Sequence, residues 1–102
     1  MKKETEKALR ASVRHWERIA LGLEEERGAT NCALCQRFGS TCQLISGERC
    51  PVFEHTGQDD CNQTPYFEWR AAHYYLVPRK ARPDHSQMLA QLEAEFLRDL
   101  LP

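Results

Sequence analysis

Long apolar runs are missing from this sequence. No segment approaches the roughly 20 consecutive apolar residues that a membrane-spanning helix requires, and the first ten residues, MKKETEKALR, carry charges with no apolar stretch behind them. A secretory signal is therefore not expected, and we expect a cytoplasmic protein that does not enter a membrane. Because a reducing cytoplasm keeps most cysteines as thiols, the five cysteines of this chain are not expected to form disulfides.

An excess of charge of either sign is also lacking. Fourteen lysines and arginines nearly cancel fifteen aspartates and glutamates, and the formal net charge is -1. A protein held on nucleic acid by its overall charge would be strongly basic, so such bulk attraction is not expected. The apolar content of 41% is ordinary for a folded protein. We expect a single domain, 1–102, with a small core.

Known motifs of catalytic metal sites are absent as well. Neither H-E-x-x-H nor the H-x-E…P-C-x-x-C pattern of zinc deaminases occurs in the chain. Glu54, His55 and the pair Asp59-Asp60 lie among the cysteines and could serve a catalytic metal. Enough thiolates are present, however, to close a four-coordinate site without water. We therefore expect a structural metal site and a protein that is not an enzyme.

What the sequence does contain is helical periodicity at both ends. In the N-terminal region, 1–27, apolar residues recur at steps of three and four from about residue 3, which places them on one face of a helix. We predict one long amphipathic helix, ended by Gly28 because glycine accepts the left-handed conformation that follows many helices. Its apolar face is Leu9, Val13, Trp16, Ala20 and Leu23, with Ile19 beside them.

The C-terminal region, 64–102, predicts two further helices. Thr64-Pro65 is a good helix start, because threonine can cap and proline is preset for the first helical position. A basic connector between Pro78 and Pro83 then separates the two helices. The face predicted for the first of them is Tyr66, Trp69, His73 and Leu76.

The start of the last helix has the pattern of a capping box. Asp84 stands in the cap position and Gln87 follows three residues later. The predicted apolar face of this helix is Met88, Leu89, Leu92, Phe96 and Leu100, with Leu97 and Leu101 beside it. The sequence thus predicts a mainly α fold: a long N-terminal helix, a loop-rich cysteine region and two C-terminal helices.

All five cysteines fall in the middle region, 28–63, which has few large apolar side chains. Burying each of these would contribute about 1.5–3 kcal/mol, whereas ordering the backbone costs about 1–2 kcal/mol per residue. A loop-rich segment of this length therefore needs a staple, and bound metal would provide one. The large apolar side chains are Leu34, Phe38, Leu44, Ile45, Val52 and Phe53.

The cysteine spacing favours zinc. A C-x2-C pair suits tetrahedral zinc, because a tight turn directs two thiolates at one ion. Cys50 lies in a turn-like stretch before a proline, and Cys61 lies three residues before Thr64, at the predicted helix start. The predicted zinc ligands are Cys32, Cys35, Cys50 and Cys61.

Two alternatives remain for this site. Cys42 is the extra thiol in our assignment, although Cys42 or His55 could replace one of the four ligands. An iron–sulfur cluster is the other metal centre to consider, since Cys50-Pro51 is typical of the end of a cluster motif.

The same region resembles a known pattern. Cys32-x-Leu34-Cys35, Cys50-Pro51-Val52, Gly57 and Cys61-x2-Thr64-Pro65-Tyr66 together resemble small cysteine-rich proteins of phages and prophages. The resemblance covers 32–66 and implies zinc binding and an origin in a mobile element. It also implies a non-enzymatic protein that binds and modulates or inhibits a host protein. The chain departs from the pattern in the seven residues between Cys42 and Cys50, where a shorter gap is expected.

Two basic stretches leave a second function open. A zinc-stabilised nucleic-acid-binding module could use the stripe on the first helix and the patch Arg79–Arg82. Acidic residues at helical spacing, such as Glu6 before Arg10, instead favour a solvated surface for the stripe. The apolar face of the first helix could also pair two chains, so a homodimer is a further expectation. The stripe is Lys3, Lys7, Arg10, Arg14 and Arg18.

Overall fold

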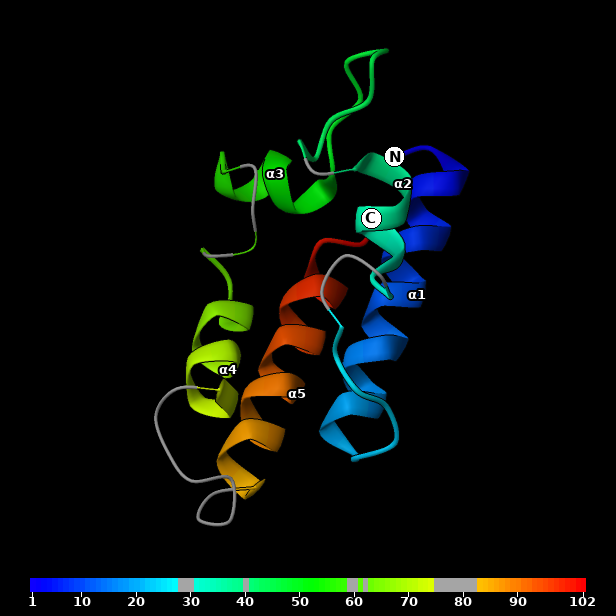
Figure 1. Ribbon diagram of the computed structural model, residues 1–102. Coiled ribbons are helices and arrows are strands. Elements are labelled where there is room, and N and C mark those ends of the chain that lie inside the picture. Colours follow the sequence, from blue (N-terminus) through cyan, green and yellow to red (C-terminus); the bar gives the residue numbers. More distant parts are fainter. Residues whose placement is uncertain (28–30, 40, 59–60, 62, 75–82) are drawn as a thin grey trace.

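The computed structural model describes residues 1–27, 31–39, 41–58, 61, 63–74 and 83–102, without the side chains of 72–74 and 83–85. Within these ranges the chain forms helices and no strand, which confirms the predicted mainly helical fold. The molecule is elongated, with extents of 45 × 21 × 20 Å (Figure 1). The helices are α1 (Lys3–Ala20), α2 (Ala33–Phe38), α3 (Pro51–Thr56), α4 (Pro65–Tyr74) and α5 (Pro83–Asp99).

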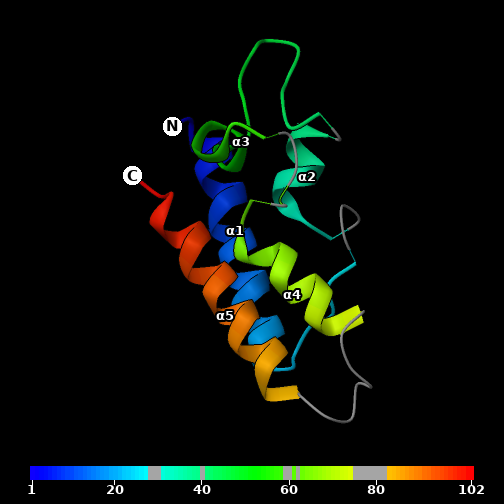
Figure 2. The ribbon, with the colours of Figure 1, turned by 90° about the vertical axis from the view of Figure 1, so that its left-hand side faces the viewer.

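Helices α1, α4 and α5 form the body of the molecule, which we call the bundle (Figures 1 and 2). Helix α5 packs against both α1 and α4. Trp16 of α1 meets two rings of α4 edge to face, with centroid distances of 5.6 Å to Tyr66 and 5.1 Å to Trp69. Such aromatic pairs add about 0.5–1.5 kcal/mol each beyond the area they bury. No helix in the described part is both long and apolar enough to cross a membrane.

The first helix is shorter than predicted. Helix α1 ends at Ala20, because Gly22 takes a left-handed conformation with φ of 76°. The N–H of Gly22 donates to the carbonyl of Ile19 at 3.0 Å, and the N–H of Leu23 donates to that of Arg18 at 2.8 Å. This pair of bonds is a Schellman motif, which satisfies the last carbonyls and turns the chain back. Leu23, expected on the buried stripe, is 71% exposed, and Gly28 lies outside the described residues.

The buried face of α5 also differs from the prediction. Met88 is 54% exposed and Leu92 is 41% exposed, although both were placed on the apolar face. Two alanines lie in the contact instead, and short side chains let neighbouring helices approach closely. Glu93, a charged residue that lies outside the predicted apolar face, is buried as well. The buried residues of α5 are Leu89, Ala90, Glu93, Ala94 and Leu97.

The predicted start of α4 is confirmed. Thr64 Oγ1 accepts a hydrogen bond from the N–H of Tyr66 at 3.1 Å, which is the bond of a helix N-cap. The side chains of His73 and Asp84, together with Leu76 and the patch Arg79–Arg82, lie outside the described part of the chain.

The cysteine region contains two short helices, α2 and α3, that the loop prediction missed. Between them a narrow hairpin projects beyond the bundle (Figures 1 and 2). Its arms pair through a single antiparallel bridge between Gln43 and Arg49, and the N–H of Leu44 donates to the carbonyl of Glu48 at 2.7 Å. Ile45 at its tip is fully exposed. We call the described residues 31–61 the cysteine module.

Candidate metal centre

Two of the predicted ligands stand at the start of short helices. Cys32 is the N-cap residue of α2, and Cys50 is the N-cap residue of α3, where Pro51 begins the helix. Peptide N–H groups in the first turn of each helix favour the thiolate form of these cysteines. This is the general effect of N–H groups and partial positive charge at a helix start. The local fold therefore provides two positions that suit a thiolate ligand.

The C-x2-C pair comes together as its spacing predicted. A hydrogen bond with the Cys35 thiol lowers the pKa of Cys32 to about 6. That same bond, together with burial, raises the pKa of Cys35. One proton is thus held between two sulfur atoms, so this pair readily supplies one thiolate.

Cys42 lies beside a predicted ligand. The N–H of Cys50 donates to the carbonyl of Cys42 at 2.8 Å, so the two cysteines face each other at the base of the hairpin. Cys42 adopts a left-handed backbone conformation with φ of 57°, which is uncommon for a residue other than glycine. Burial raises the pKa of Cys50 to about 11. The residue that we set aside as the extra thiol is therefore close to the candidate centre.

Cys61 completes the group of thiols. Burial raises the pKa of Cys61, and the charges of Glu93, Cys32, Cys50 and Cys42 raise it further. None of the five cysteines, all of which lie in the described part, forms a disulfide. Among the described residues, however, no three His, Cys, Asp or Glu side chains are arranged to hold a metal ion. The sulfur atoms thus gather in one neighbourhood, and the ligand set stays a prediction.

The sequence analysis missed Glu93, which is 2% exposed. Thr64 Oγ1 is 2.9 Å from a carboxylate oxygen of Glu93 and 2.7 Å from the carbonyl of Cys61. One hydroxyl proton cannot serve two acceptors, so a protonated Glu93 would donate to Thr64 while Thr64 donates to Cys61. Burial accordingly raises the pKa of Glu93 to about 7. Its position midway between Leu89 and Leu97 on the helix was the available signal.

The reserve ligand His55 belongs to a different contact. Its exposed ring packs edge to face on Phe96 of α5, with centroids 5.5 Å apart. Glu54 beside it is exposed, and Asp59-Asp60 lies outside the described residues.

Comparison with protein-family models, with curated proteins and with solved structures found no match to this chain. The function is therefore argued from the residues of the chain itself.

Proposed function

We propose that this chain is a small zinc-binding protein without catalytic activity that binds and modulates a host protein, as the phage and prophage proteins resembling it would. The observation that carries the proposal is that all five thiols lie in one module, where several of them influence each other's charge, and that this module buries fewer apolar side chains than the bundle. Cys32, Cys35, Cys50 and Cys61 would hold the ion. Zinc would supply four-coordinate closure and tie α2, α3 and the start of α4 to one point.

Energetics favour a metal in this region. Among its apolar side chains, the cysteine module buries only Leu34, Phe38, Cys50, Pro51 and Val52. At about 1.5–3 kcal/mol for each large side chain, this burial does not offset a backbone entropy cost of about 1–2 kcal/mol per ordered residue. Structural zinc contributes about 10–16 kcal/mol to the folding of small modules, and it would offset part of this cost.

The hairpin is the surface that we assign to the partner. Glu48 anchors it to the bundle, because its carboxylate accepts a hydrogen bond from Thr5 of α1 and lies 3.0 Å from the guanidinium of Arg37. Ile45 stands in solvent at the far end of this anchored segment. A fixed apolar side chain of this kind suits a pocket on a protein partner, since buried anchors supply most of the energy of such contacts.

The basic stripe of α1 gives less support to nucleic-acid binding. Arg10 pairs with Glu6 at 3.3 Å, and Arg18 pairs with Glu24 at 3.0 Å. Two of the five cations of the stripe are therefore balanced by carboxylates, which would repel phosphates. Binding of nucleic acid remains the alternative outcome of the partner experiment.

The first experiment is elemental analysis of protein purified without added metal, with each cysteine changed to serine in turn. We expect about one zinc per chain, the number that one four-thiolate site holds. The zinc should be lost on changing Cys32, Cys35, Cys50 or Cys61 and kept on changing Cys42. Iron and sulfide in place of zinc would indicate a cluster, and a folded protein without metal would overturn the proposal.

A second experiment addresses the partner. The zinc-loaded chain is used as bait, and Ile45→Asp is compared with Ser46→Asp, which changes the same loop without removing an apolar side chain. We expect the first change to abolish capture of a protein partner and the second to spare it, both at high salt. Capture of nucleic acid that weakens steeply with salt would instead support the alternative.

A further inference from the structure

The segment 21–27, which we call the strap, turns back along α1 toward α2 (Figure 1). The Schellman motif at Gly22 produces this reversal. The strap ends four residues before Asn31, the residue that precedes the first cysteine. The position of the strap therefore bears on where the cysteine module begins.

His15 joins the strap to α1 through both of its ring nitrogens. Nδ1 faces the carboxylate of Glu24, and Nε2 lies 2.9 Å from the carboxylate of Glu26. When Glu24 and Glu26 are both ionised they can only accept, so both ring nitrogens then carry protons and the ring is an imidazolium. His15 is 7% exposed, which places this contact largely out of water.

Other charges around this contact act on the carboxylates. Arg18, one turn further along α1, lies 3.0 Å from Glu24. The negative charge of Glu26 acts to raise the pKa of Cys32, at the start of α2, and that of Glu93, on α5. Glu26 is thus surrounded by groups of like charge, and His15 is its cationic partner in the described part of the chain. Its hydrogen bond with Glu26 raises the pKa of His15 above the ordinary value of 6.5.

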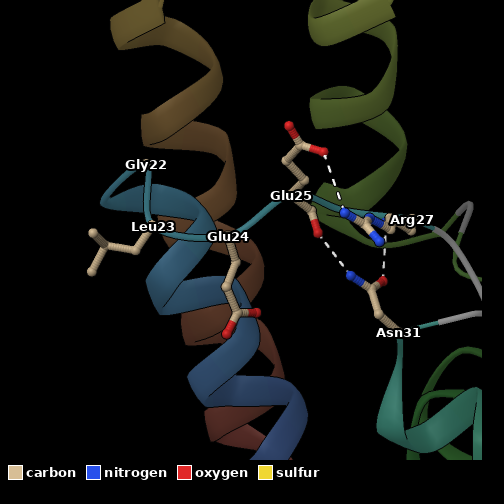
Figure 3. Close-up of a pocket in the computed structure, with 6 residues that line it drawn as sticks. All are labelled: Gly22, Leu23, Glu24, Glu25, Arg27 and Asn31. Carbon is tan, nitrogen blue, oxygen red and sulfur yellow. Dashed lines mark hydrogen bonds and ion pairs between the residues drawn. The ribbon is translucent and has the colours of Figure 1, made fainter.

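The far end of the strap is fixed by neutral bonds. Asn31 Nδ2 donates to the carbonyl of Glu25 at 2.7 Å, and the N–H of Arg27 donates to Asn31 Oδ1 at 3.0 Å. Figure 3 shows these groups around an open pocket of about 470 Å³ that runs from Gly22 to Asn31. These bonds do not change with pH, so the histidine contact is the part of the strap that responds to protons.

We propose that His15 is a proton-controlled latch: as an imidazolium it holds the strap on α1, and on losing its proton it releases the part of the strap that contains Glu24 and Glu26. The latch rests on the geometry of His15 and does not require the proposed function. Because the folded value of the histidine pKa is raised, the stabilisation is complete below pH 6.5, the unfolded value, and is lost as pH rises through the folded value.

The test uses the full-length, isotope-labelled chain in the form in which it is purified. NMR follows the ring signals of His15 while hydrogen exchange reports the protection factors of strap amides, across about pH 5 to 9, the range that histidine titration covers. We expect His15 to titrate above 6.5. Strap protection should fall by up to about tenfold per pH unit between that value and the folded pKa, as release of one proton requires.

Variants separate the latch from general effects of pH. His15→Gln should lower strap protection at low pH to the level that the unchanged chain reaches at high pH, and so remove its pH dependence. Glu26→Gln should bring the pKa of His15 closer to 6.5. His55→Gln, which changes an exposed histidine on α3, should leave the strap profile as in the unchanged chain. If His15 in the unchanged chain titrates at or below 6.5, or if strap protection does not vary with pH there, the latch is wrong. The unchanged chain alone decides this even if His15→Gln fails to fold.

Discussion

The bundle buries nine apolar side chains among the described residues, whereas the cysteine module buries five. In the bundle the buried side chains touch across helices far apart in sequence, as Trp16 does with Trp69. In the module each short helix supplies only two buried apolar side chains. About half of the described residues outside these helices form the exposed hairpin. The bundle therefore has more side-chain packing to hold it than the module, although the buried side chains of both belong to one core cluster. For the module we propose that bound metal supplies the difference.

Removal of metal should produce the largest difference in stability between the two regions. A chelator should cost the module most of the roughly 10–16 kcal/mol that structural zinc provides, while the bundle keeps its packing. Amides of α2 and α3 should lose their protection from hydrogen exchange, and amides of α1 and α5 should retain it. Cys42→Ser serves as the control that keeps the metal. If the bundle loses its protection together with the module, the two regions are one cooperative unit and the comparison fails.

Trp16→Ala should have the next largest effect, on the bundle. Trp16 is 4% exposed and contacts both rings of α4, and removal of such a side chain costs about 3–5 kcal/mol. Guanidinium unfolding followed by far-UV circular dichroism measures the change in the free energy of unfolding. Leu23→Ala, at a leucine that is 71% exposed, should change it by no more than about 0.5 kcal/mol.

Glu93→Gln tests whether the buried carboxyl destabilises the bundle as pH rises. Because its folded pKa, about 7, lies above the ordinary 4.5, the folded state holds a proton that the unfolded state releases. Stability should therefore fall as pH rises from 4.5 through about 7, by an amount on the order of 3 kcal/mol. Urea unfolding at several pH values should show this slope in the unchanged chain and not in Glu93→Gln.

Two outcomes sharpen that measurement. Glu95→Gln, at an exposed position two residues along the same helix, should keep the full slope. If bound metal abolishes the slope in the unchanged chain, a cation must lie close enough to stabilise the Glu93 carboxylate, and the residue then belongs to the metal centre as much as to the bundle.

The smallest effects are expected at two glycines. Gly22 and Gly57 have φ of 76° and 73°, where a side chain costs about 1–2 kcal/mol. Gly22→Ala should lower the free energy of unfolding of the bundle by that amount, since only the end of the Gln87 side chain is near, at 4.0 Å. Gly57 ends α3. Gly57→Ala should therefore weaken zinc affinity without changing the stability of the bundle. Equal effects of both changes on global unfolding would contradict the separation of the two regions.

The helical ends of the chain were predictable because their periodicity is long. Leu9, Val13 and Trp16 lie on the buried face of α1 as predicted. The residue at which α1 ends was not predictable. Gly22 and Gly28 are equally good helix stops in sequence, and the contacts of the strap favour Gly22. On α5, Leu89 and Leu97 are buried as predicted, whereas Met88 and Leu92 are exposed. Hydrophobicity alone could not anticipate that the buried face includes Glu93, which Thr64 satisfies.

Less of the candidate centre could be predicted. The closeness of Cys32 and Cys35 follows from local spacing, which one turn of chain fixes. The placement of Cys42 beside Cys50 depends on the tight turn from Leu44 to Glu48, and no residue pattern in that loop specified it. The ligand assignment and the phage-like role remain predictions.

The reversal at Gly22 also affects the order of folding. It lets His15 meet Glu24 and Glu26, residues only 9 and 11 positions away, whereas Thr64 and Glu93 are 29 apart and Thr5 and Glu48 are 43 apart. The entropic cost of closing a loop rises with the number of residues between the two contacting positions, so local contacts form faster. We expect α1 and the strap to pair while the ribosome is still synthesising the chain, before α5 exists. The growing chain would then present its first cysteines next to an ordered helix rather than on a free tail.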